Sequence, residues 1–334
     1  MTTTPLAMIS NIAAVMPSDR AARWLVGGTL TILGVGTIVG LLLRFRTTTD
    51  AGRRTVANLN ARIRAWWVMA AVFALAIFFQ RIGATILFAM ISFLALREML
   101  TITPTRRGDH HTMFWAFFVL IPIQYYLVYI QWYGLFAIFI PVYAQIFLAI
   151  RSTLTGDYTR YLERTAKIQW GAFICIYCIS HAPALLTLHV PGYDGHPWEL
   201  LVWLVIVVQM SDVLQYCWGK LLGRRKIAPH ISPNKTWEGF IGGVLTATLL
   251  GAALCRITPF HPWQAAVIAF TVAVLGFFGG IVMSAVKRDA GVKDYGQLIE
   301  GHGGMMDRID SLTFAAPIFF HIVRFLFIAP PPGG

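Results

Sequence analysis

A polar stretch from Ser284 to Ser311, SAVKRDAGVKDYGQLIEGHGGMMDRIDS, interrupts a sequence that is otherwise strongly apolar. Its mixture of acids, bases and glycines is too polar to cross the hydrocarbon of a membrane. Asp307 and Asp310 lie three residues apart, so they share one face of a helix, and with Asp294 they could hold a divalent cation. The stretch therefore predicts a chemical site in which neighbouring bases serve a phosphate group: Lys287, Arg288, Lys293 and Arg308.

Hard oxygen ligands beside lysines and arginines are the arrangement that phosphoryl or nucleotidyl transfer needs, since Mg²⁺ and the bases neutralise the charge of a triphosphate. Gly303 and Gly304 would let the backbone approach a phosphate closely. His302 precedes them, and a turn histidine bonded to the backbone explains it as well as a phosphate contact does. The stretch has no Walker A sequence, and salt bridges among a loop's own charges are the alternative explanation.

A second polar stretch runs from residue 211 to residue 243, and it begins with an acid near the end of an apolar segment, Asp212. A carboxylate inside a membrane helix costs about 2.5–3.5 kcal/mol, so it needs a cation, a water-filled cavity or a basic partner. An ion pair with Lys220 or Arg224 across a short turn would satisfy it. A role in the site is the interpretation we prefer.

The later part of this stretch reads Ser-Pro-Asn-Lys-Thr-Trp-Glu-Gly and precedes another apolar segment. Pro233 suits a helix start or a turn, and free backbone amides at a helix N-terminus bind phosphate well. Ser232 and Lys235 would add a hydroxyl donor and a point charge. A basic cluster that touches lipid headgroups explains the bases equally well, but it does not explain the acid, the hydroxyls and the glycines together.

The elements that position these residues are membrane helices. Of the 334 residues, 57% are hydrophobic and only 13% are charged, and the mean hydropathy is +0.65. Apolar segments match the length of about 20 residues that a helix needs to cross a bilayer. We therefore predict an all-α, polytopic membrane protein with about ten transmembrane helices. The apolar segments lie at about 24–43, 66–80, 82–97, 113–130, 132–150, 168–188, 198–217, 239–257, 263–283 and 312–329.

The second and third segments are short, so the region 66–97 could also form one long tilted helix or a re-entrant pair. Five groups of Lys and Arg lie between the segments, and two proposed helices separate each group from the next. All five groups therefore fall on one side, which should be the cytoplasm. The net charge of +12 indicates anionic headgroups or a polyanionic substrate rather than nucleic acid.

The spaced polar positions resemble the signature of the phosphatidate cytidylyltransferases, also called CDP-diacylglycerol synthases. The residues that carry the resemblance are Ser284, Lys287, Arg288, Lys293, Asp294, Gly296, His302, Gly303, Gly304, Asp307, Arg308, Ile309 and Asp310. The segment 232–239 is similar to a second stretch typical of these enzymes, and Asp212 with Lys220 matches more loosely. The resemblance covers roughly the C-terminal 125 residues. Two departures are Glu300, where the family usually has Pro or Gly, and Gln215, where a small residue is common.

This resemblance implies a Mg²⁺-dependent transfer of the cytidylyl group from CTP to phosphatidic acid. It implies metal binding by Asp212, Asp294, Asp307 and Asp310, with Lys293 and Arg308 joining the last three acids as catalytic residues. The implied substrate-binding residues are Lys220, Ser232, Lys235, Ser284, Lys287, Arg288, His302, Gly303 and Gly304. Residues 166–334 would form the catalytic region, and residues 1–165 would form helices to which we assign no role.

The apolar segments and the loop charges together predict a multi-pass protein of the cell membrane whose active site, at the ends of the C-terminal helices, faces the cytoplasm. The sequence leaves a homodimer open. One alternative is transfer to a different lipid phosphate, and another is a lipid transporter without enzymatic activity. A transporter should place its ionisable residues near the membrane midplane in broken helices, whereas these residues cluster at helix ends.

The loop charges make a testable prediction about orientation. Reporter fusions after Arg225 and after Tyr193 should report opposite sides of the membrane, with Arg225 in the cytoplasm, because the first lies in a basic loop and the second in a loop without Lys or Arg. Alkaline phosphatase and fluorescent-protein fusions measure this directly. The same reporter active at both positions would contradict the proposed helix count.

Overall fold

The computed structural model describes residues 20–46, 49–193, 196–296 and 303–328. Within these ranges, ten helical segments are long and apolar enough to cross a membrane, which confirms the predicted all-α architecture. Each of the ten apolar segments expected from the sequence falls on one of these spans. The described residues form two compact units, one ending at Phe78 and the other beginning at Phe79.

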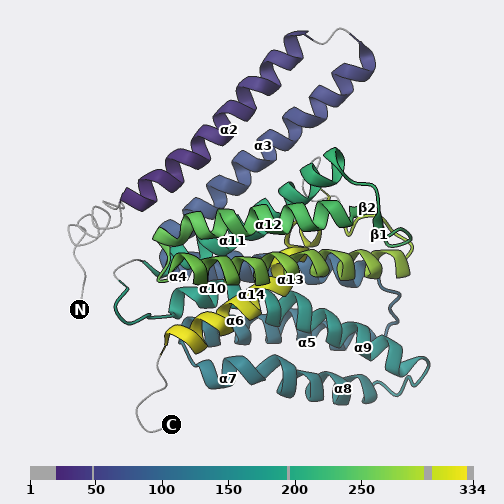
Figure 1. Ribbon diagram of the computed structural model, residues 1–334. Coiled ribbons are helices and arrows are strands. Elements are labelled where there is room, and N and C mark those ends of the chain that lie inside the picture. Colours follow the sequence, from purple (N-terminus) through teal and green to yellow (C-terminus); the bar gives the residue numbers. More distant parts are fainter. Residues whose placement is uncertain (1–19, 47–48, 194–195, 297–302, 329–334) are drawn as a thin grey trace, which may run out of the picture. The chain divides into compact units, whose positions relative to one another are not determined.

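The first unit is a pair of helices, α2 (Arg20–Arg46) and α3 (Asp50–Phe78), shown in purple and blue-violet in Figure 1. Asn60 Nδ2 donates to Gly40 O at 3.3 Å, and Trp67 Nε1 donates to Thr37 Oγ1 at 3.0 Å. The helix expected at 66–80 begins much earlier, at Asp50, and its additional first half is polar. Its span, Thr55–Phe78, is long enough to cross a bilayer by itself.

The helix α3 ends at Phe78, and a new helix, α4 (Gln80–Thr101), begins two residues later. Its first residue has a φ of +50°. The next spans of the second unit contain π-helical segments. They are α5 (Asp109–Trp115) with η1 (Ala116–Leu120) and α6 (Ile121–Tyr129); α7 (Tyr133–Ile138) with η2 (Phe139–Ala144) and α8 (Gln145–Thr153); and α9 (Tyr161–Ala172) with η3 (Phe173–Cys178), α10 (Ile179–Ala184) and the 3₁₀ turn η4 (Leu185–Thr187).

The remaining helices are α11 (Pro197–Leu221), α12 (Trp237–Ala253) with the 3₁₀ turn η5 (Leu254–Ile257), α13 (Pro262–Asp289) and α14 (Met306–Phe327). Figure 1 shows these long helices lying side by side in the second unit. Trp203 of α11 is fully buried, stacks on Phe319 at 5.2 Å between ring centroids, and donates from Nε1 to Gly251 O at 3.2 Å. This contact joins three of the four helices.

Glycines let these helices approach closely near the polar end of the bundle. A Cβ at Gly279 would lie 2.7 Å from the ring of Phe314, and one at Gly243 would lie 2.6 Å from the Cα of Gln215. Small residues at helix interfaces allow this close backbone approach in membranes. Gln215, the departure noted in the sequence, fits because Gly243 faces it, and its Nε2 donates to Ser211 Oγ at 2.7 Å.

A short antiparallel hairpin, β1 (Lys226–Ala228) and β2 (Ser232–Thr236), connects α11 to α12. Pro233, which suits a helix start or a turn in the sequence, lies instead within β2. The helix begins at Trp237 instead, where Thr236 acts as the N-cap and its Oγ1 accepts from Gly239 N at 3.1 Å. The hairpin carries Ser232 and Lys235 to the end of the helical bundle.

Candidate active site

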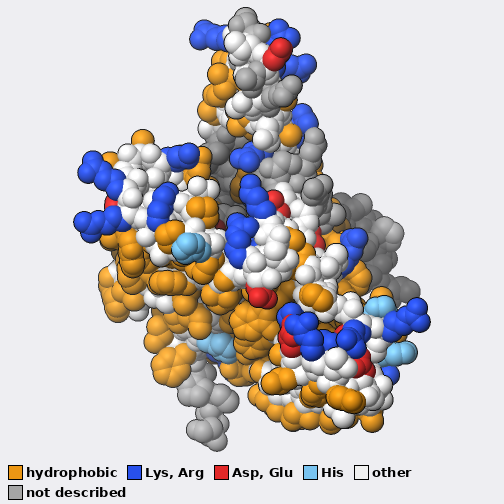
Figure 2. Space-filling view, turned by 90° about the vertical axis from the view of Figure 1, so that its right-hand side faces the viewer, with side chains coloured by type: hydrophobic (Ala, Val, Ile, Leu, Met, Phe, Trp, Pro, Cys, Tyr) orange, Lys and Arg blue, Asp and Glu red, His pale blue; other side chains and the backbone are white. Residues whose placement is uncertain are grey.

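The polar residues of the two stretches gather at one end of the second unit. Here the C-terminal ends of α11 and α13 meet the N-terminal end of α14 and the strand β2. Figure 2, which faces this end, shows Lys and Arg side chains gathered over it with fewer acidic ones. Segments that are distant in the sequence therefore form one polar region at the edge of an apolar bundle.

Asp307, in the first turn of α14, is the most extensively bonded acid of this region. Lys287 Nζ donates to its Oδ1 at 2.7 Å, and both side chains are nearly buried. Its Oδ2 accepts from Tyr295 N at 2.9 Å and from Gly304 N at 3.0 Å. The carboxylate thus ties α13, the segment after α13 and the turn before α14 into one structure.

The turn before α14 needs glycine at both positions predicted from the sequence. Gly303 has a φ of +83°, and a Cβ there would lie 3.1 Å from Asp307 Oδ2. A Cβ at Gly304 would lie 2.8 Å from Gly296 N. The backbone, rather than side chains, therefore occupies this part of the site.

Glu98, at the end of α4, also holds this turn, and sequence reasoning missed it. Its Oε1 accepts from Met305 N at 2.8 Å and its Oε2 accepts from Met306 N at 2.9 Å. A negative charge at a helix N-terminus stabilises the unpaired amides of the first turn. The signal was present, since Glu98 is an acid directly after an apolar segment, but its partners lie more than 200 residues later.

Lys235 reaches from β2 into the bundle, where it is largely buried. Its Nζ donates to Phe277 O at 3.1 Å and lies 4.5 Å from the centroid of the Phe277 ring. Gly280 makes room for it, because a Cβ at that position would lie 2.7 Å from Nζ and 3.7 Å from Asp310 Oδ2. Burial lowers the pKa of Lys235, and the nearby carboxylates of Asp212 and Asp310 oppose this effect.

Asp212 and Asp310 face each other across α11 and α14. Each carboxylate interacts electrostatically with Lys235, and Asp212 also interacts with Asp310, with the side chain of Ser311 and with Arg308. Among the described residues, neither acid has a cation within 4 Å, whereas Asp307 does. Two half-buried carboxylates that repel each other and share distant cations can accept a metal ion or a ligand that brings its own charge.

Arg308 contributes a cation to the same region from the first turn of α14. Its Nε is buried and has no hydrogen-bond partner among the described residues. Its carbonyl oxygen accepts from Gln209 Nε2 at 3.2 Å, which fixes α14 against α11. An unsatisfied guanidinium donor is costly unless a ligand completes it.

The other predicted residues lie around this centre. Ser284 Oγ donates to Gly280 O within α13, and Arg288 joins the hairpin to the segment after α13 by donating to Ile231 O at 3.2 Å and Val292 O at 2.9 Å. Lys220 lies over the ring of Tyr216 at 5.9 Å. Ser232 is half-buried, whereas Lys293 and Asp294 are exposed. His302 and Glu300 lie outside the described residues.

The arrangement therefore divides the four predicted metal ligands. Asp212 and Asp310 are close together, Asp307 is bound to Lys287 and backbone amides, and Asp294 lies at the surface. The described residues contain no cluster of three or more His, Cys, Asp or Glu side chains that could hold a metal ion. Two hard carboxylates still fit Mg²⁺, which is commonly held by one or two carboxylates together with substrate phosphates.

The contacts of Glu98 lead to a prediction about stability. Glu98→Gln should cost about 1–3 kcal/mol, because one oxygen acceptor becomes an amide donor facing a backbone N–H. The thermal unfolding midpoint in detergent and hydrogen exchange at residues 303–312 measure the global and the local effect. Glu163→Gln is the control, since Glu163 pairs with Lys167 at 2.8 Å on a more exposed surface. Unchanged exchange in Glu98→Gln would contradict the proposed role.

Comparison with known proteins places this chain in a family. A model of the cytidylyltransferase family matches residues 60–326. The chain is 38% identical over 295 residues to the uncharacterized protein YnbB of Escherichia coli K12, covering 88% of this chain and 95% of that protein. It is 38% identical over 162 residues to the phosphatidate cytidylyltransferase of Haemophilus influenzae, covering 44% of this chain and 54% of that enzyme.

A further match is the phosphatidate cytidylyltransferase of Mycobacterium leprae, 41% identical over 126 residues, covering 37% of this chain and 40% of that enzyme. The chain thus spans about half the length of the named enzymes that it matches. The family match extends over most of the chain, including every described residue of the site. The protein therefore belongs to the cytidylyltransferase family, as the two polar stretches predict.

Proposed function

We propose that this protein transfers the cytidylyl group of CTP to phosphatidic acid, forming CDP-diacylglycerol and releasing pyrophosphate. One observation carries the proposal: the partly buried side chains of Asp212, Asp310 and Lys235 interact with one another at one end of an apolar helical bundle. Such a site can receive a polyphosphate from water and a lipid phosphate from the membrane. The names of the relatives in H. influenzae and M. leprae support this choice of reaction.

In the proposed reaction, a phosphate oxygen of phosphatidic acid forms a bond to the α-phosphorus of CTP. The bond from that phosphorus to the oxygen bridging to the β-phosphate breaks, and pyrophosphate leaves with the electron pair. The attacking oxygen is already anionic, so the site needs no general base. Lys235 and Arg308 hold the triphosphate and stabilise the charge that develops on the leaving group.

Mg²⁺ belongs to this proposal. Asp212 and Asp310 would hold it with phosphate oxygens of the substrate as further ligands, while Asp294 and Asp307 stay predicted ligands. When bound, the ion would neutralise the triphosphate and polarise the α-phosphate. Lys287 supports Asp307 in this arrangement, and the remaining predicted contacts to substrate are those of Lys220, Ser232, Ser284, Arg288, Lys293, His302, Gly303 and Gly304.

The proposal places the enzyme in the cell membrane with this site towards the cytoplasm, where CTP is available. A homodimer is compatible with the reaction. A different lipid phosphate is the second candidate acceptor, since the named cytidylyltransferases align with less than half of this chain.

The direct test uses purified, folded protein in detergent with labelled CTP, Mg²⁺ and phosphatidic acid. We expect CDP-diacylglycerol and pyrophosphate in equal amounts. Parallel reactions with other lipid phosphates distinguish the two candidate acceptors. Folded protein that forms no cytidylylated lipid from any of them would refute the proposal.

Removing single acids from the site should separate their roles. Asp310→Asn and Asp212→Asn should each lower kcat by at least about a hundredfold and raise the Mg²⁺ concentration needed for half-maximal rate. Asp294→Asn and Asp307→Asn should also abolish turnover while the protein remains inserted. Asp157→Asn, which changes an acid outside this centre, is the control. Full activity in any one of the four variants would remove that acid from the site.

The buried environment of Lys235 predicts an alkaline limit to activity. Its pKa is lowered by burial, and the charged ammonium binds the triphosphate, so activity is lost as the pH rises through that lowered pKa. Arginine remains charged in this range. The alkaline limb of the rate profile of Lys235→Arg, normalised to its own maximum, should therefore lie at higher pH than that of the wild type. Coincident limbs would show that another group limits the reaction.

A further inference from the structure

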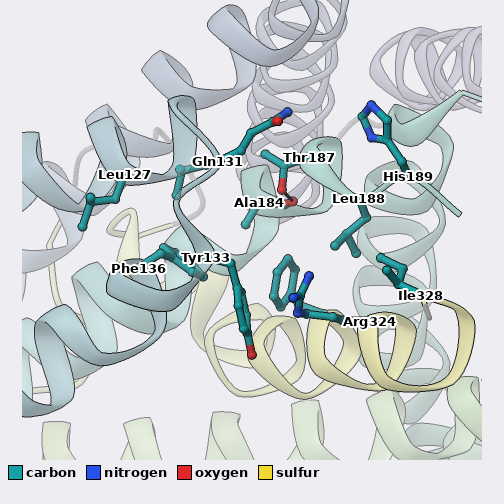
Figure 3. Close-up of a pocket in the computed structure, with 12 residues that line it drawn as sticks. Leu127, Gln131, Tyr133, Phe136, Ala184, Thr187, Leu188, His189, Arg324 and Ile328 are labelled. Carbon is teal, nitrogen blue, oxygen red and sulfur yellow. Dashed lines mark hydrogen bonds between the residues drawn. The ribbon is translucent and has the colours of Figure 1, made fainter. Parts of the chain in front are cut away.

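A second polar feature lies at the opposite end of the same unit. A cavity of about 240 Å³ opens between the turn that joins α6 to α7, the turn η4 and the last turn of α14 (Figure 3). Arg324 lines it from α14, about 25 Å along the helix axis from Asp307. The cavity is therefore separate from the catalytic centre, and nothing in the proposed reaction uses it.

Arg324 is the charged group of this cavity. Its Cζ lies 3.6 Å from the centroid of the Tyr133 ring, so the guanidinium stacks on the aromatic face (Figure 3). None of the described residues that line the cavity is acidic, and no described carboxylate lies within 4 Å of Arg324. Stacking fixes the plane of a guanidinium and leaves its N–H edge available for bidentate binding of a phosphate.

Two further polar side chains line the cavity from other segments. Gln131 comes from the turn between α6 and α7, where its φ of +61° and the bond from its N to Val128 O at 3.1 Å set its direction. His189 follows η4 and is exposed. In Figure 3 both side chains lie on the side of the pocket away from the Arg324 guanidinium, and their ends point away from it. Arg324 is therefore the group of this pocket that can bind an anion, while Gln131 and His189 form part of its polar rim.

Most of the remaining lining is apolar and closes the cavity towards the bundle, and the hydroxyl of Thr187, also in the lining, donates to Ala184 O at 2.7 Å. Leu127, Leu188 and Ile328 form part of its walls. Phe136 and Phe320 lie deeper, with ring centroids 4.8 and 5.3 Å from that of the buried His181. The cavity is thus a pocket and not a path through the molecule. Its volume of about 240 Å³ is enough for a phosphate with part of a glycerol group.

We propose that this pocket binds the phosphate group of a membrane phospholipid. The phosphate would bind to Arg324, and the glycerol and first acyl carbons would lie against the apolar walls. The pocket lies at the ends of membrane-spanning helices, beside Tyr129 and Trp132, which are aromatic residues typical of the membrane interface. These surroundings favour a lipid over a soluble phosphate.

Binding to delipidated protein in a neutral detergent tests the proposal. Native mass spectrometry would compare phosphatidylglycerol, diacylglycerol with the same acyl chains, and glycerol 3-phosphate. We expect phosphatidylglycerol to bind wild-type protein and to bind Arg324→Gln about ten- to a hundredfold more weakly, because charge-assisted hydrogen bonds are lost. Lipid binding at the catalytic centre is common to both proteins and cancels in this comparison.

Arg256→Gln is the matched control, since Arg256 is an exposed cation of η5 at the same end and does not line the pocket. It should bind like the wild type. Arg324→Lys keeps the charge without the planar fork and should bind with intermediate affinity, which guards against misfolding of the glutamine variant. Equal binding to Arg324→Gln and wild type, or equal binding of diacylglycerol, would overturn the proposal. Competition by glycerol 3-phosphate as strong as that by the lipid would overturn the choice of a lipid.

Discussion

The site depends on hydrogen bonds and ion pairs to carboxylates at the edge of an apolar bundle. A buried, unpaired carboxylate is costly, and Asp307 avoids that cost by accepting hydrogen bonds from Lys287, Tyr295 and Gly304. These bonds fix the last turn of α13 and the first turn of α14 relative to each other. The remaining acids, Asp212 and Asp310, are therefore held in place by helices whose register Asp307 has already set.

Glycine makes this density of charge possible in a membrane protein. Gly280 leaves the space that Lys235 occupies, and Gly304 leaves the space beside Glu98. Larger residues at these positions would push the helices apart. The acids and bases would then lie farther from each other, and their electrostatic interaction would be weaker. The close packing of the helices therefore also determines how strongly the charged groups of the site interact.

Local patterns predicted a large part of the fold. The ten spans followed from the lengths of apolar runs, and the three-residue spacing of Asp307 and Asp310 placed both acids on α14. The hairpin was missed because β2 contains Pro233, Asn234 and Lys235, which lack the pattern of a typical strand. The early start of α3 was missed because polar residues hide a helix from a search for apolar runs.

Contacts between distant segments could not be predicted in the same way. The bonds of Glu98 join α4 to the start of α14 across more than 200 residues, and no spacing rule applies at that separation. Single-sequence reasoning divided the chain at about residue 165 and assigned no role to the earlier helices. Glu98 shows that α4, which lies in that earlier part, supports the turn that carries the site.

The charge distribution of the centre explains why a reaction of two anions could occur there. Asp212 and Asp310 hold negative charge that Lys235 and Arg308 compensate only at a distance, since the described residues show no ion pair for either acid. A triphosphate alone would be repelled by the acids, and a divalent cation alone would be repelled by the bases. In the proposed function, a metal–triphosphate complex would match both sets of charges at once, so the centre would select the complex over either of its parts. The same argument explains why the centre lies at the end of the helices: such a complex keeps part of its hydration, which the bundle interior could not provide.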